Sequence, residues 1–139
     1  MLLDLKYDPS PETAVLFARD IVDLARYVSD VALDYSERSL EAVDSILQSF
    51  TDGGVRVHDV KGTLFGFGCY VGEVFVQTAG GAWKALAADD KSLEFLGWPL
   101  VVQLPSGTVC NPIGKVFKRL ELGESENLPY FYKVFANRV

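Results

Sequence analysis

The sequence has few of the residues that bind metals or form disulfides. Among its 139 residues there are two cysteines, Cys69 and Cys110, and a single histidine, His58. A zinc site needs three or four Cys or His ligands at short spacings, and this sequence does not provide them. Both cysteines stand in apolar segments, so we expect free, buried thiols in a reducing compartment. We expect no metal and no cofactor.

Long apolar runs and a basic leader are also lacking. No apolar run approaches the roughly 20 residues that a membrane-spanning helix needs. The first 13 residues, MLLDLKYDPSPET, contain acids early and lack the basic start and continuous apolar stretch of a signal peptide. We therefore expect a cytoplasmic protein with no membrane partner.

The motifs of common enzyme classes are absent as well. The chain contains no GxSxG, HExxH or Walker sequence. Glycines at 66, 68 and 72 resemble a GxGxxG phosphate loop only superficially, because the second spacing is four residues instead of three. His58 and Asp59 are adjacent, but no motif places a nucleophile for them, so we interpret them as a polar turn. We assign no catalytic residue and favour a protein that is not an enzyme.

Negative charge is concentrated in the first part of the chain. Residues 1–60 hold 5 Lys or Arg and 12 Asp or Glu, a balance of −7, whereas residues 61–139 hold 8 and 7, a balance of +1. An acidic half repels phosphate backbones, so we expect no nucleic-acid partner. The same charge suits a basic protein partner, although an acidic surface can also serve only to keep a protein dissolved.

Apolar periodicity predicts an α+β fold in a single domain covering residues 1–139. Apolar residues make up 49% of the chain, which is long enough to bury its own core. Helical spacing predicts two N-terminal helices, one over about 11–29 capped by Ser10 and one that is capped by Ser36 and stops at DGG (52–54). The segment between them, VALDY (31–35), alternates and predicts a short strand or an extended link.

The C-terminal half predicts a small antiparallel sheet of about three strands and two further helices. A hairpin over 99–110 has a turn at PSG (105–107), and SLEFLGW (92–98) can form one helical turn. The two C-terminal helices are predicted to begin at Asn111-Pro112 and near Ser125 or Asn127.

For two of the predicted helices, the spacing also predicts whether one face is buried or exposed to solvent. In the first helix the spacing predicts a buried face made of Val15, Phe17, Ile21, Leu24 and Val28. In the helix after Asn111, the basic residues Lys115, Lys118 and Arg119 share one face. That face is either a basic patch or an ordinary solvated exterior, and we favour the exterior.

The glycine-rich segment over residues 62–76 allows two secondary structures. Its Val, Phe and Tyr content favours a strand, and four glycines disfavour a helix. Apolar residues nevertheless recur at helical spacing, and Gly68 and Gly72 stand four residues apart. On a helix those two glycines would form a smooth stripe against which another backbone can pack closely.

Four pieces of the sequence resemble a family of small bacterial domains of unknown function. They are SLEAVDSIL (39–47), GCYVGEVFVQTAGGAW (68–83), PLVVQLPSG (99–107) and NPIGKVFKRLELGE (111–124). In that family a helix bearing GxYxGEv precedes a strand bearing gGxW. The resemblance covers about residues 40–135 and implies an α+β fold with a helix over 62–77, but no activity. Gly66 is an additional glycine that departs from the pattern.

Tyr70, Glu73 and Trp83 are the site candidates, with two interpretations. As architecture, the three polar groups bond to one another and hold a helix to a sheet. As a functional pocket, Glu73 is a general acid or base with a raised pKa, in a cleft that could include His58. We favour the structural interpretation, because a hydrolase of the glycosidase type needs a second carboxylate that no motif specifies.

The sequence thus supports three functional hypotheses. The first is a non-enzymatic interaction protein, such as an immunity or antitoxin protein that binds a basic partner. The alternative is a small-ligand-binding protein or hydrolase that uses a cleft around Tyr70, Glu73 and Trp83. The third is a homodimer formed through aromatic surface, for which Tyr130 and Tyr132 stand off the apolar side of the last helix.

Overall fold

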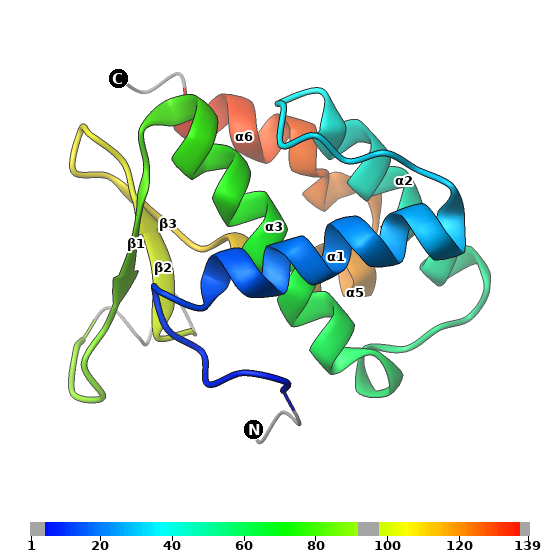
Figure 1. Ribbon diagram of the computed structural model, residues 1–139, viewed down its shortest axis with the longest axis horizontal. Helices are drawn as coiled ribbons and strands as arrows, with labels where there is room; N and C mark the ends of the chain where they lie inside the picture. The colour runs from blue at the N-terminus through cyan, green and yellow to red at the C-terminus, as the bar shows by residue number, and fades with distance from the viewer. Residues whose placement is uncertain (1–4, 92–97, 137–139) are drawn as a thin grey trace.

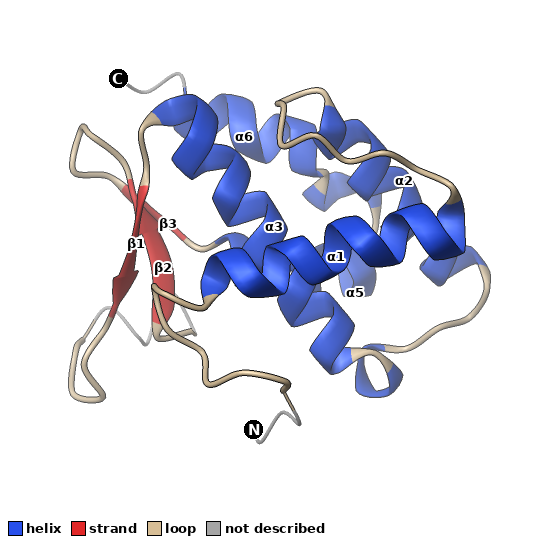
Figure 2. Cartoon of the chain, in the orientation of Figure 1, coloured by secondary structure: helices blue, strands red, loops and turns tan. Residues whose placement is uncertain are grey.

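The computed structural model describes residues 5–91 and 98–136, which form an α+β fold (Figures 1 and 2). Helices gather around one central helix, and a three-stranded antiparallel sheet lies at one end of them. The α-helices are α1 (Ala14–Ser29), α2 (Ser39–Asp52), α3 (Lys61–Ala79), α5 (Pro112–Leu122) and α6 (Leu128–Ala136). The strands are β1 (Ala82–Ala85), β2 (Leu100–Gln103) and β3 (Val109–Cys110), and two short 3-10 turns are η1 (Val57–Asp59) and η2 (Glu124–Glu126). Within the described ranges no helix is both long and apolar enough to cross a membrane.

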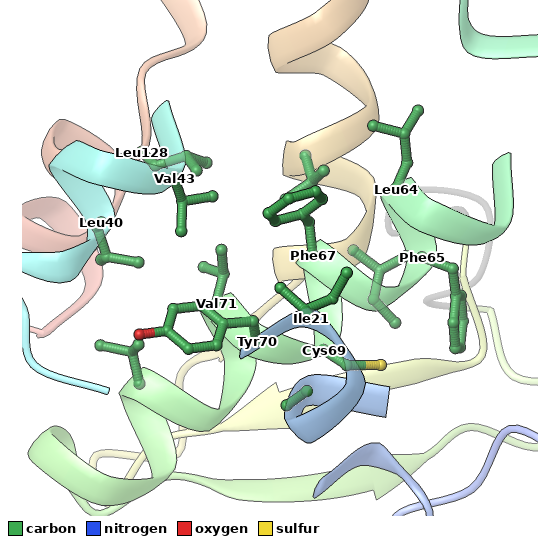
Figure 3. Packing of buried hydrophobic residues seen from close by; sticks show 14 of the residues in the cluster. Ile21, Leu40, Val43, Leu64, Phe65, Phe67, Cys69, Tyr70, Val71 and Leu128 are labelled. Carbon is green, nitrogen blue, oxygen red and sulfur yellow. The ribbon is translucent and has the colours of Figure 1, made fainter. Parts of the chain in front are cut away.

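The glycine-rich segment is the central helix, α3. Twelve consecutive residues, from Leu64 to Phe75, are buried, so the helix is apolar on all sides and lacks the one-sided pattern of a surface helix. Helix α1 crosses in front of it in Figure 1, and α5 packs behind. Figure 3 shows Tyr70 and Val71 of α3 beside Leu40 and Val43 of α2. The predicted helix over 62–77 is confirmed.

Gly68 permits the close packing of α3 against α5. A methyl group at Gly68 would lie 2.5 Å from the Cα atom of Ile113, which is backbone and cannot move aside. The smooth stripe expected of Gly68 and Gly72 therefore exists, but its two glycines face different neighbours. Gly68 faces a helix backbone, and Gly72 faces the side chain of Trp83.

The sheet places Trp83 over the centre of α3. Strand order is β1-β2-β3, with Trp83 opposite Val102 and Val102 opposite Cys110. The predicted hairpin is confirmed, and Gly107 in its turn has the left-handed φ of 91° that favours glycine. The helical turn predicted over 92–98 lies almost entirely outside the described residues.

The segment between α1 and α2 is a loop, so a strand over residues 31–35 is wrong. Two residues there, Asp30 (φ 52°) and Tyr35 (φ 64°), adopt left-handed backbone conformations that break an extended strand. Ser36 does not directly precede a helix, because α2 begins at Ser39. Its Oγ instead accepts a hydrogen bond from the Ser39 N–H at 3.1 Å and orders the turn before α2.

Candidate functional site

Glu73 and Trp83 form a buried contact between α3 and the sheet. The indole N–H of Trp83 donates to Oε2 of Glu73 at 2.8 Å. Glu73 is only 6% exposed, in the middle of the buried part of α3. Trp83 is half-buried in β1, so its indole ring spans from the strand to the helix. The bond gives the carboxylate the partner that a buried charge requires.

Gly72 makes room for this contact. A methyl group at position 72 would lie 2.1 Å from Cζ2 and 2.2 Å from Cη2 of Trp83, well inside van der Waals contact. The indole ring therefore rests directly on the α3 backbone at Gly72, and the next residue supplies its hydrogen-bond acceptor. The local pattern Gly-Glu in the helix and Trp in the strand is explained by this one packing arrangement.

Tyr70 does not join the pair but holds the α1–α2 loop. Its hydroxyl oxygen accepts from the Tyr35 N–H at 2.9 Å and lies 2.6 Å from the Ser39 hydroxyl. The ring of Tyr35 stacks on the ring of Tyr70 with centroids 4.9 Å apart. Tyr70, Glu73 and Trp83 were expected to bond to one another. The structure instead has two separate contacts: Glu73 with Trp83 towards the sheet, and Tyr70 with the α1–α2 loop.

Two titratable groups of the described residues, Cys69 and Tyr35, are influenced by the charge of Glu73. Burial, and secondarily the Glu73 charge, raise the pKa of the Cys69 thiol. Burial also raises the pKa of the Tyr35 phenol, with smaller contributions from Tyr70 and Glu73. Both neighbours are thus held neutral. A substrate must also reach a catalytic acid, and a carboxylate that is 6% exposed and bonded to Trp83 favours the structural interpretation.

His58 lies far from this contact. It is exposed in η1, just before α3 begins at Lys61. Glu73 lies 12 residues after Lys61, which corresponds to about 18 Å along the helix axis at 1.5 Å per residue. The neighbouring Asp59 pairs with Arg56 at 3.7 Å on the surface. The interpretation of His58 and Asp59 as a polar turn is confirmed, and a cleft that combines His58 with Glu73 is wrong.

Arg119 is not on a solvated face, and that expectation is wrong. Its side chain is 1% exposed and donates to both carboxylate oxygens of Asp44, at 2.9 and 3.2 Å, and to Gln48 at 2.9 Å. Asp44 also accepts from the Leu128 N–H at the start of α6, at 3.0 Å. One carboxylate–guanidinium pair, with Arg119 buried and Asp44 19% exposed, thus joins α2, α5 and α6. Its Nη1 is buried without a hydrogen-bond partner among the described residues.

The other two basic residues of that group remain near the surface. Lys115 is ion-paired with Glu126, and its ammonium nitrogen lies 5.6 Å from the centre of the Phe131 ring. Lys118 is exposed and, with Lys115, lines a pocket of about 270 Å³ at the start of α5. Because Lys115 is already neutralised by Glu126, this pocket offers a ligand little net charge.

The buried face predicted for the first helix is correct only in its middle, because Val15 at its start is half-buried. Phe17 and Ile21 are buried, but Leu24 is 36% and Val28 is 72% exposed, and Tyr27 beside them is 87% exposed. The apolar periodicity runs to the end of α1, whereas the packed core stops at about Ala25. The spacing of apolar residues could not predict that burial stops near Ala25. Burial there depends on how far the neighbouring elements reach, and the sequence of one helix does not show this.

Neither metal ligands nor known relatives identify the site. No group of three or more His, Cys, Asp or Glu side chains that could hold a metal ion occurs in the described part of the chain. Comparison of the chain with protein-family models, with curated proteins and with solved structures gives no match.

Proposed function

We propose that this protein is a non-enzymatic, protein-binding domain whose acidic N-terminal part binds a basic partner, as an immunity or antitoxin protein does. The Glu73–Trp83 contact belongs to the architecture, so the search for function moves to the surface. The observation that supports the proposal is the distribution of exposed charge.

The charge asymmetry of the sequence is a surface property. In residues 5–60 nine acidic and five basic side chains are exposed. The nine acids are Asp8, Glu12, Asp23, Asp30, Asp34, Glu37, Glu41, Asp52 and Asp59. In the described residues after 60, three acids (Asp89, Glu121 and Glu124) and four basic residues are exposed. Asp44, the acid that Arg119 neutralises, is not among them. The N-terminal part thus presents an excess of four negative charges to solvent, and the rest presents none.

Such an asymmetric field accelerates association with a basic protein. Complementary charge raises association rate constants by one to three orders of magnitude at low ionic strength, and salt screens the effect. An inhibitor that must capture its target quickly benefits from this more than an enzyme does.

The test neutralises exposed acids in the two halves separately. One variant carries Glu12→Gln, Glu37→Gln and Glu41→Gln, and the matched control carries Asp89→Asn, Glu121→Gln and Glu124→Gln. Both remove three exposed negative charges, so the net charge is equal. The immobilised protein is used to capture basic proteins from a lysate of its host, and association rates are measured at about 50 and 300 mM salt.

We expect the N-terminal variant to associate about tenfold more slowly at low salt and the control to behave like the original protein. The difference should largely vanish at high salt. Equal rates for both variants, or the absence of any basic partner at low salt, would contradict the proposal.

A further inference from the structure

Helix α1 is joined to the rest of the fold through one neighbour. Among the helices and strands of the described residues, α3 is the one against which α1 packs extensively, and Figure 1 shows α1 lying across it. The rings of Phe17 and Phe65 meet edge to face, with centroids 5.0 Å apart. A methyl group at Gly66 would lie 2.9 Å from the Ile21 side chain. Because α3 itself also packs against α5 and the sheet, α1 can leave without separating those elements from one another.

The segment before α1 is attached to this helix. The ring of Tyr7 meets the ring of Phe17 edge to face, with centroids 5.0 Å apart. The ammonium group of Lys6 pairs with the Asp20 carboxylate at 3.6 Å. Both partners belong to α1, so the segment and the helix can move together. We call residues 5–29 the N-terminal unit.

The chain turns at a single residue where this unit ends. Asp30 (φ 52°) is one of two non-glycine residues with positive φ in the described part of the chain, and three residues later Leu33 is buried in the core. A residue with a Cβ atom adopts this conformation at a cost that glycine avoids. The other such residue, Tyr35, is anchored, because its N–H donates to the Tyr70 hydroxyl at 2.9 Å. Residues 30–32 are thus the part of the loop where a hinge disturbs the core least.

We propose that two copies of this chain exchange their N-terminal units at high concentration and form a domain-swapped dimer. Exchange keeps the contacts between α1 and α3, because α1 of one copy takes the place of α1 in the other. Only the hinges change: the chain crosses between copies at residues 30–32, so Asp30 can leave its left-handed conformation. The opposing cost is the loss of freedom on association, which a higher protein concentration offsets. The inference is independent of the function proposed above.

Exchange should be slow in the folded protein and fast during refolding. For α1 to leave, the buried middle of α3 must lose the helix that covers one of its sides. Monomer and dimer should therefore interconvert slowly once they are folded. During refolding α1 is not yet packed, and it can dock on α3 of either chain. The protein concentration during refolding then sets the ratio of dimer to monomer.

The test refolds the protein from urea at about 10 μM and at about 1 mM and measures the dimer by sedimentation velocity. A disulfide then reports which chain supplies α1. Ile21→Cys combined with Gly66→Cys places two thiols at the α1–α3 contact, and loss of the Ile21 branch makes room for the new side chain. The disulfide closes within one chain in a monomer and links two chains in an exchanged dimer, which electrophoresis without reducing agent separates. Each single cysteine variant is a control for unrelated links.

Two exposed positions in the hinge provide a matched pair of variants. Asp30→Gly removes the cost of the left-handed conformation from the folded-back chain, whereas Ala32→Gly adds a glycine where φ is not positive. We expect Asp30→Gly to lower the dimerisation constant about tenfold, because both hinges of a dimer are affected. Ala32→Gly should change it less than about threefold. Since both side chains are exposed, this comparison remains valid if the cysteine pair disturbs the core.

Three results would overturn the exchange. The first is a protein that stays monomeric after refolding at about 1 mM. The second is a dimer whose disulfides remain within each chain, since its copies would then be joined by a surface contact. The third is an equal effect of Asp30→Gly and Ala32→Gly on the dimerisation constant. A dimer that forms at the higher concentration, carries disulfides between its chains and is weakened only by Asp30→Gly supports it.

Discussion

Replacing Gly72 by alanine should destabilise the protein through Trp83. The added methyl would lie 2.1 Å from an atom of the indole ring, so the ring must shift away from α3. That shift lengthens or breaks the 2.8 Å bond from the indole N–H to Glu73. The carboxylate would then be left in a buried position without its partner.

The expected cost follows from three contributions. Alanine stabilises a helix interior by about 1 kcal/mol relative to glycine. Overpacking costs about 1–3 kcal/mol, and losing a hydrogen bond to a charged group costs about 1.5–3 kcal/mol. The free energy of unfolding should therefore fall by about 1.5–5 kcal/mol, although the helix propensity alone predicts a gain.

A double-mutant cycle tests the cause. Urea unfolding followed by far-ultraviolet circular dichroism gives the free energy of unfolding for Gly72→Ala, Trp83→Ala and the double variant. Without the indole ring the methyl has space, so Gly72→Ala should stabilise the Trp83→Ala protein by about 1 kcal/mol. An equal loss in both backgrounds would refute the reasoning, because the cost would then have nothing to do with Trp83.

Three other substitutions probe the remaining contacts. Tyr70→Phe removes the hydroxyl that holds the α1–α2 loop and should lower the free energy of unfolding by about 1–3 kcal/mol in a urea titration. Asp44→Ala leaves the buried Arg119 guanidinium without its counterion and should cost about 3–5 kcal/mol by the same assay; a loss under 1 kcal/mol would contradict this role of Asp44. The side-chain hydrogen bond from Lys115 holds the pKa of Glu126 below its ordinary 4.5, so its stabilisation is complete above pH 4.5 and lost as pH falls through the lowered pKa. When the free energy of unfolding is measured against pH, it should therefore fall less steeply below pH 4.5 for Glu126→Gln than for the original protein. Identical pH profiles would contradict the pairing.

Local signals in the sequence predicted the start of α5, and they stood about one turn ahead of α1 and α2, which begin at Ala14 and Ser39. Asn111 followed by Pro112 opens α5, and the Asn111 side chain accepts from the Gly114 N–H at 2.9 Å. Ser10 and Thr13 bond reciprocally, at 3.0 and 3.1 Å, in the turn before α1. Capping depends on residues three or four positions apart, so one sequence suffices to predict it.

Tertiary contacts were the part that the sequence could not predict. Arg119 has the spacing of an exposed residue, and only the approach of Asp44 from α2, 75 residues earlier, explains its burial. Tyr132 was expected beside Tyr130 on the surface, yet it is buried and its hydroxyl lies 2.7 Å from the Thr78 hydroxyl. Glu73 and Trp83 were singled out correctly because a carboxylate within an apolar run needs a partner. The contact of Tyr70 with Tyr35 and Ser39 could not be predicted, because it depends on how the α1–α2 loop folds back over α3.

The glycine content of α3 has a consequence for how the chain folds. Four glycines within its 19 residues lower its intrinsic helix stability by about 4 kcal/mol relative to alanine, so the isolated segment cannot hold a helix in water. Yet α3 is the element that α1, α5 and the sheet all contact. The centre of the fold can therefore form only together with its surroundings. Helix α3 and the helices packed on it, α1 and α5, should therefore form in a single kinetic step. No partly folded state that retains α3 alone should accumulate.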